Sequence, residues 1–140
     1  MKTLKLDEEQ LSLLKDIICK EGEFLKQLEF RIEVGFCNDI SDFSKKAKES
    51  ISNNMSIVSD LMLYKKSSFE DSYYNYIINV VKMHYAMQCQ IVNRIKNNIW
   101  WTLGKPDNLS FESLEEDVPE DEIEKRNNLK TLLESLEFEL

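Results

Sequence analysis

The fold is decided by residues 69–103, FEDSYYNYIINVVKMHYAMQCQIVNRIKNNIWWTL, a stretch of 35 residues without glycine or proline. Apolar side chains, and one histidine among them, recur every three or four positions, as along one face of an amphipathic helix. The members of this stripe are Tyr73, Ile77, Val80, Val81, His84, Met87, Ile91, Ile95 and Ile99. A helix of this length would extend about 50 Å. Because it is apolar around much of its circumference, we expect it to lie centrally, with neighbours on more than one side.

Three further helices are expected, over residues 7–34, 41–65 and 119–138, from the same spacing of apolar residues. Glycine and proline number only 3 and 2, whereas sheets and barrels need many tight turns. Residues 104–118 are expected to form an irregular acidic connection. The prediction is an all-α protein: a four-helix bundle-like single domain, 1–140, with up-down connections, a long central third helix and an acidic C-terminal segment.

Short-range signals mark where these helices begin and where they weaken. Asp7 and Gln10 have the spacing of a capping box at the start of the first helix, and Ser67 and Glu70 have it before the third. In residues 50–56, SISNNMS, serine and asparagine compete for backbone hydrogen bonds, so fraying or a kink is expected. Gly22 interrupts the first helix at a cost of about 1 kcal/mol relative to alanine.

Charge is distributed unevenly along the chain. Residues 107–140 hold 12 Asp and Glu against 3 Lys and Arg, whereas residues 1–106 hold 14 against 15. The last quarter therefore carries the whole imbalance behind the net charge of −8. Such an acidic block is either a solvated linker or a means of attracting a basic partner at long range.

Reactive side chains are too few and too scattered to suggest a catalytic or metal centre. His84 is the only histidine, and the Glu-x-x-His motif of helical di-iron sites fails because position 81 is Val81. Cys19, Cys37 and Cys89 are an odd number at irregular spacing, which favours free thiols in a reducing compartment. Phosphate-binding loops and nucleophile elbows do not occur. We therefore expect a protein that is not an enzyme and that holds neither a cofactor nor a metal.

Direct contact with nucleic acid or with a membrane is also not expected. Basic residues gather only in two small patches, at residues 45–48 and 65–66, and the acidic end would repel phosphate. No run of 18 apolar residues occurs, and no apolar leader follows Met1. Together with the thiols, these observations predict a cytoplasmic protein.

The aromatic residues at the two ends of the long helix are candidates for contact with a partner protein. Trp100 and Trp101 point about 100° apart on a helix. Either both close one end of the bundle, over Phe36 and Phe111, or one is exposed as a binding anchor.

At the other end of this helix, Tyr73 is expected to point inward and Tyr74 elsewhere, and exposed tyrosines suit a contact surface. A third candidate surface is the acidic run from Glu112 to Glu124, which contains eight carboxylates and no basic residue. Its candidate contact residues are Glu115, Glu116, Asp117, Glu120, Asp121 and Glu122.

These features predict a non-catalytic protein-binding module that inhibits or adapts another protein. It would act through a contact surface and not through a reactive centre. Its expected shape and its acidity are similar to those of bacterial immunity proteins, antitoxins and phage-encoded inhibitors as a class, and the implied partner is a basic protein. The alternative is a structural or assembly subunit that associates with itself. The third helix is longer than the fourth, and a homodimer through the third helix would cover its remaining apolar surface.

Overall fold

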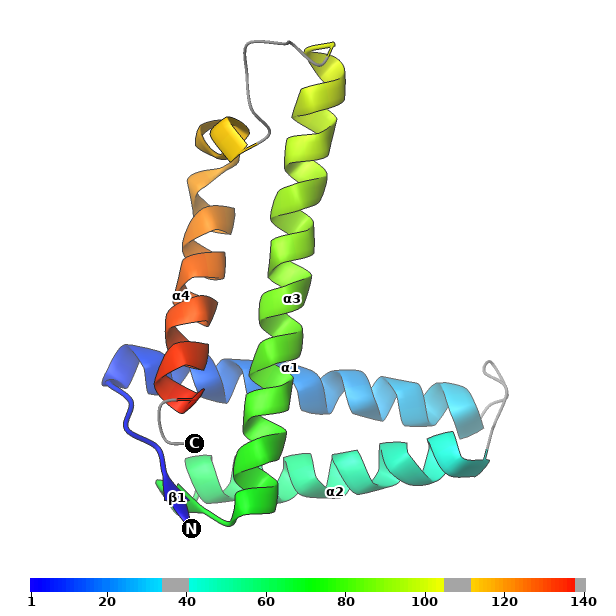
Figure 1. Cartoon of the computed structure of the whole chain (residues 1–140). Helices are drawn as coiled ribbons and strands as arrows, with labels where there is room; N and C mark the ends of the chain where they lie inside the picture. The colour runs from blue at the N-terminus through cyan, green and yellow to red at the C-terminus, as the bar shows by residue number, and fades with distance from the viewer. Residues whose placement is uncertain (34–40, 105–111, 138–140) are drawn as a thin grey trace.

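Helices make up most of the chain in a computed structural model that describes residues 1–33, 41–104 and 112–137 (Figure 1). In chain order the elements are β1 (Lys2–Thr3), α1 (Glu8–Glu33), α2 (Ser41–Met62), β2 (Ser68–Phe69), α3 (Asp71–Thr102), the 3-10 helix η1 (Glu112–Asp117) and α4 (Glu120–Glu137). The predicted all-α class, with a long third helix, is confirmed. Among the described residues, no helix combines the length and the hydropathy that crossing a bilayer requires.

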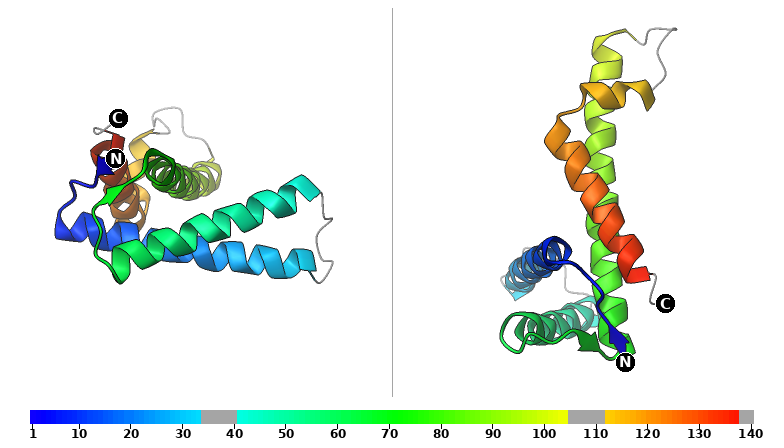
Figure 2. Two further views of the ribbon diagram at one scale, coloured as in Figure 1. Left: turned by 90° about the horizontal axis from the view of Figure 1, so that it is seen from below. Right: turned by 90° about the vertical axis from the view of Figure 1, so that its left-hand side faces the viewer.

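The four helices form two antiparallel pairs that cross each other. α1 packs along α2, and α3 packs along α4, while η1 lies against the second half of α3 (Figures 1 and 2). Figure 1 shows the first pair crossing α3 and α4 near the start of α3. The up-down order therefore holds within each pair, whereas the two pairs cross instead of running side by side.

The largest apolar cluster lies where the pairs cross, and all four helices contribute to it. The side chains that are fully buried in this core include Leu14 and Ile18 of α1, Ile57 of α2, Ile77 of α3 and Leu132 of α4. Complete burial of such side chains contributes roughly 1.5–3 kcal/mol each. The crossing point therefore holds the two pairs together.

A short antiparallel clip joins the first residues of the chain to the segment before α3. Lys2 pairs with Phe69 and Thr3 with Ser68, and the backbone N–H of Leu4 donates to the Ser67 carbonyl over 2.6 Å. The capping box predicted from Ser67 is wrong. α3 instead begins at Asp71, and the residue before it makes no side-chain cap hydrogen bond. The backbone of residues 67–69 is used by the clip, so it is not available to start a helix.

The capping box predicted for α1 is confirmed. The Gln10 backbone N–H donates to Asp7 Oδ1 over 2.8 Å, and the Asp7 N–H donates to Gln10 Oε1 over 3.2 Å. Both hydrogen bonds are local, so four residues of sequence suffice to specify them.

The segment SISNNMS does not interrupt α2, because its second asparagine is used between helices. α2 is continuous through residues 50–56, so the expected fraying is wrong there. Asn54 is buried, and its Nδ2 donates to the Ile18 carbonyl over 2.9 Å and to the Tyr76 hydroxyl over 3.2 Å. A Cβ on Gly22 would stand 2.4 Å from Asn54 Oδ1, closer than Cβ atoms approach a neighbour. Gly22 is thus the residue that lets α1 and α2 come this close.

The second half of α3 turns a different face to its neighbours than the sequence predicts. Met87 and Ile91 belong to the predicted inward stripe, yet they are 51% and 40% exposed. Gln88, Val92 and Lys96 are buried in their place, facing α4 and η1. Two adjacent faces of α3 carry apolar residues here, and α4 and η1 cover only one of them.

Candidate protein-binding surfaces

The two tryptophans differ in exposure. Trp100 is half-buried, and Trp101 is 66% exposed at the end of α3. Because neighbouring helical residues point about 100° apart, a helix that turns one indole toward its neighbours leaves the other outside. The expected cover by Phe36 and Phe111 falls outside the described residues.

Tyr74 is a core residue, and the expectation that it points away from the bundle is wrong. Its ring is fully buried, its hydroxyl donates to the Leu136 carbonyl over 2.7 Å, and Lys2 Nζ lies 5.7 Å from the ring centroid. Tyr73, which was expected to point inward, is half-buried. Tyr74 therefore fastens the end of α4 to the start of α3 and offers no surface to a partner.

The acidic segment divides into carboxylates used within the chain and carboxylates directed to solvent. Glu122 Oε2 accepts a hydrogen bond from Gln88 Nε2 over 2.6 Å, and Glu115 is paired with both Arg126 and Lys96, the latter over 3.5 Å. Four of the six candidate carboxylates remain exposed: Glu116, Asp117, Glu120 and Asp121.

Glu115 fixes η1 in place. The hydrogen bond from Arg126 holds the pKa of the Glu115 carboxyl below its ordinary 4.5, and the charges of Arg126 and Lys96 lower it further. The same hydrogen bond raises the pKa of Arg126. Lys96 is almost fully buried beneath this pair, so one carboxylate links residues from α3, η1 and α4. The sequence placed Glu115 in an irregular connection and did not suggest this anchoring role.

A line of exposed apolar side chains follows α3 on the face that α4 leaves uncovered. This exposed stripe consists of Met83, Met87, Ile91 and Trp101. At 100° per residue, the four directions fall within about 80° of one another around the helix. Arg94, which is also exposed, lies within the same sector. The stripe was not expected, because its central members had been assigned to the core.

Where α1 crosses α3 and α4, side chains of all three helices border a cleft of about 330 Å³. Leu13 and Ile17 of α1, Met87 and Ile91 of α3 and Leu129 of α4 form its apolar lining. A second cleft of about 220 Å³, between α1 and α4, shares two lining residues with the first. We call the two together the junction groove.

His84 lies at the base of the junction groove, beside a buried carboxylate. Its Nε2 is 3.4 Å from Glu21 Oε2, and Glu21 is only 8% exposed. The pair connects α1 to α3 beneath the groove. In the parts of the chain that the structure describes, no group of three or more histidines, cysteines or acidic residues is arranged to hold a metal ion.

The described thiols, Cys19 and Cys89, are free and half-buried, whereas Cys37 lies outside the described residues. The pKa of Tyr85 is raised, mainly by a hydrogen bond with the Cys89 side chain and secondly by burial. Burial likewise raises the pKa of Tyr76, which the hydrogen bond with Asn54 partly offsets. The Tyr85 shift thus arises mainly from a contact within α3, and the Asn54 hydrogen bond to Tyr76 joins α2 to α3.

Comparison of the chain with protein-family models, with curated proteins and with solved structures found no match in any of the three.

Proposed function

We propose that the chain is a non-catalytic protein-binding module that inhibits or adapts a basic protein. The main support is the exposed stripe of α3, which consists of Met83, Met87, Ile91 and Trp101. The same helix packs against the acidic η1 and α4, so one helix is associated with both an apolar surface and a concentration of negative charge. Contiguous exposed apolar side chains flanked by polar ones are typical of interaction sites. Tryptophan and methionine are both enriched in protein interfaces.

The exposed carboxylates of η1 and α4 would give the chain its preference for a basic partner. Glu116, Asp117, Glu120 and Asp121 are directed to solvent within a segment whose net charge is −9, from 12 acidic and 3 basic residues. A field of one sign accelerates association with an oppositely charged protein and suppresses encounters with acidic ones. The apolar stripe would then hold the partner that the charges attract.

The experiment begins with affinity capture from source-cell extract, identification of the retained protein and reconstitution with that purified protein. The association rate is then compared for the parent chain and for the variant Glu116→Gln/Asp117→Asn/Glu120→Gln/Asp121→Asn. Loss of four steering charges should slow association about tenfold or more at low salt and should flatten its salt dependence.

The matched control removes four exposed carboxylates elsewhere, through Glu8→Gln, Glu23→Gln, Glu49→Gln and Glu70→Gln. Both variants change the net charge equally, so only the position of the charge differs. Equal slowing by both variants would show that position is irrelevant, and an unchanged rate in the first variant would refute the proposal.

Self-association through α3 is the second candidate function, and the same exposed stripe favours it. A parallel or antiparallel contact between two copies would cover Met83, Met87 and Ile91. It would also bring Arg94 of each copy into the interface. Light scattering distinguishes the two candidates directly, because a monomer has a mass of 16.5 kDa and a dimer has twice that.

A further inference from the structure

We infer that the junction groove docks a short amphipathic helix of the partner, apolar along one side and flanked by lysine or arginine. The inference rests on the proposed function and specifies which part of the partner this surface recognises. A helix laid by its apolar face into a groove between other helices is a recurrent mode of peptide recognition.

The floor of the groove has the shape that such a helix requires. Leu13, Ile17 and Phe24 are separated by four and seven residues, so they follow one face of α1, and Phe24 is 55% exposed beyond the cleft. Met87 and Ile91 of α3 line the same cleft beside these α1 residues. Two apolar lines thus meet at a corner, and the flexible methionine side chain adapts to different occupants.

The lysines at the rim do not exclude a basic occupant. Lys20 Nζ lies 2.9 Å from Asp16 Oδ2, and Lys125 Nζ lies 3.7 Å from Glu122 Oε1, so carboxylates of the chain already offset both lysines of the lining.

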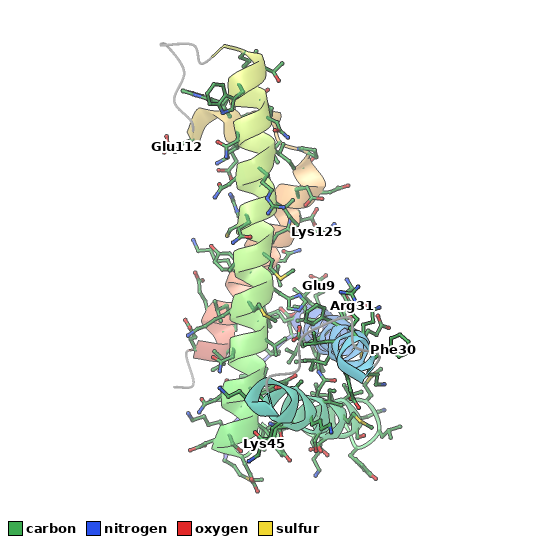
Figure 3. All side chains as sticks on the ribbon, turned by 90° about the vertical axis from the view of Figure 1, so that its right-hand side faces the viewer. Glu9, Phe30, Arg31, Lys45, Glu112 and Lys125 are labelled. Carbon is green, nitrogen blue, oxygen red and sulfur yellow. The ribbon has the colours of Figure 1, made fainter. Side chains whose placement is uncertain are left out.

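Further carboxylates border each end of the groove. Asp7 and Glu9 line the end between α1 and α4. Figure 3 shows Glu9 and Lys125 on the same side of α3. Asp121, Lys125 and Asn128 are spaced i, i+4 and i+7, which places exposed Asp121 one turn beyond the lining residues on the same face of α4. Cations at the ends of a docked helix would meet these carboxylates.

The length of the groove sets the length of the occupant. From Asp7 to Lys20 the floor follows 13 residues of α1, or about 20 Å at 1.5 Å per residue. A docked helix of three to four turns, roughly 13 residues, matches this length.

The test uses a synthetic 14-residue peptide with leucine at helical i, i+3, i+4 and i+7 spacing and lysine at the remaining positions, together with a peptide in which glutamate replaces every lysine. Binding to the full chain is followed by NMR of the leucine, isoleucine and methionine methyl groups. The lysine peptide should shift the methyl signals of Leu13, Ile17, Met87 and Ile91, and the glutamate peptide should bind at least tenfold more weakly. Shifts confined to other methyl groups, or equal binding of both peptides, would overturn the inference.

Two sets of substitutions separate the groove from general attraction to an acidic protein. Met87→Gln/Ile91→Gln should weaken the lysine peptide at least tenfold, while Met55→Gln/Leu63→Gln, at exposed apolar positions outside the groove, should leave its affinity unchanged. All four side chains are exposed, so the variants should keep the far-ultraviolet circular dichroism of the parent. Equal affinity of parent and groove variant refutes the inference, as does a concentration-dependent dimer that buries the groove methyl groups.

The groove and the proposed function can fail separately. A reconstituted basic partner that still binds Met87→Gln/Ile91→Gln, but not the chain with its four carboxylates neutralised, would remove the groove and keep the function. If the lysine peptide docks but the chain captures no basic protein, the groove would be retained and the proposed function would be refuted.

Discussion

Replacing Gly22 with alanine should destabilise the protein, although alanine is the better helix former. In an open helix the change would stabilise by about 1 kcal/mol. Here the added Cβ would lie 2.4 Å from Asn54 Oδ1 and 3.3 Å from its Cγ, so α1 and α2 must separate or the amide must leave its position. Asn54 would then lose its hydrogen bonds to the Ile18 carbonyl and the Tyr76 hydroxyl.

The expected magnitude combines three contributions. The two hydrogen bonds contribute about 1 kcal/mol each. Overpacking of a close contact between helices costs roughly 1–3 kcal/mol, and helix propensity returns about 1 kcal/mol. The net loss is therefore about 2–4 kcal/mol in the free energy of unfolding, or roughly 1–2 M in the urea midpoint at a slope near 2 kcal/mol per M.

A double-mutant cycle tests the cause as well as the size of this effect. In an Asn54→Ala background the obstructing atoms are gone, so Gly22→Ala should stabilise by about 1 kcal/mol, as it would in an open helix. Urea unfolding followed by circular dichroism at 222 nm measures all four proteins. A Gly22→Ala variant more stable than the parent, or one with the same effect in both backgrounds, would refute the close-approach argument.

Three other predictions concern single side chains. Glu115→Gln should lower the free energy of unfolding at neutral pH. Because the pKa of the Glu115 carboxyl is lowered in the folded state, its contribution to stability is fully present above the unfolded pKa and is lost as pH falls through the folded pKa. The difference in stability between parent and variant, measured by urea titration, should therefore narrow at acid pH below about 4.5. Tyr74→Phe should cost about 1 kcal/mol in urea unfolding, because the carbonyl of Leu136 loses its hydroxyl donor, and an unchanged midpoint would contradict the assigned bond. Trp101→Ala should change the unfolding free energy by less than about 0.5 kcal/mol, and Trp100→Ala by more, since Trp101 is exposed and Trp100 is half-buried; the opposite order would contradict their placement.

Features set by neighbouring residues could be predicted from the sequence. The capping box of Asp7 and Gln10 is local, and the helix bounds follow from periodicity interrupted by turn residues. The box expected at Ser67 was wrong because the competing partner, Leu4, is 63 positions away and pairs with that backbone instead. A local capping pattern does not reveal that a distant strand will form hydrogen bonds with the same backbone groups.

The orientation of α3 was predicted correctly around Ile77, Val80 and Val81, which are buried as expected, but not at Tyr74 or in the second half of the helix. Ile91 and Val92 are both apolar, and periodicity alone does not decide which of them faces a neighbour. Gln88 and Lys96 are buried because Gln88 reaches Glu122 and Lys96 reaches Glu115, contacts that depend on where α4 and η1 lie. The exposure of Asp121 and its acidic neighbours followed from composition, whereas the junction groove depends on the crossing of three helices.

α3 extends far beyond the point where the two helix pairs cross. Near Ile77, its first half packs against the α1–α2 pair. Trp101 lies 24 residues further along the helix, or about 36 Å away at 1.5 Å per residue. A change of only about 5° in the angle at which the two helix pairs cross would displace the far indole by roughly 3 Å at that radius. An occupant of the junction groove that changed this angle would therefore displace Trp101 much further than the residues at the crossing.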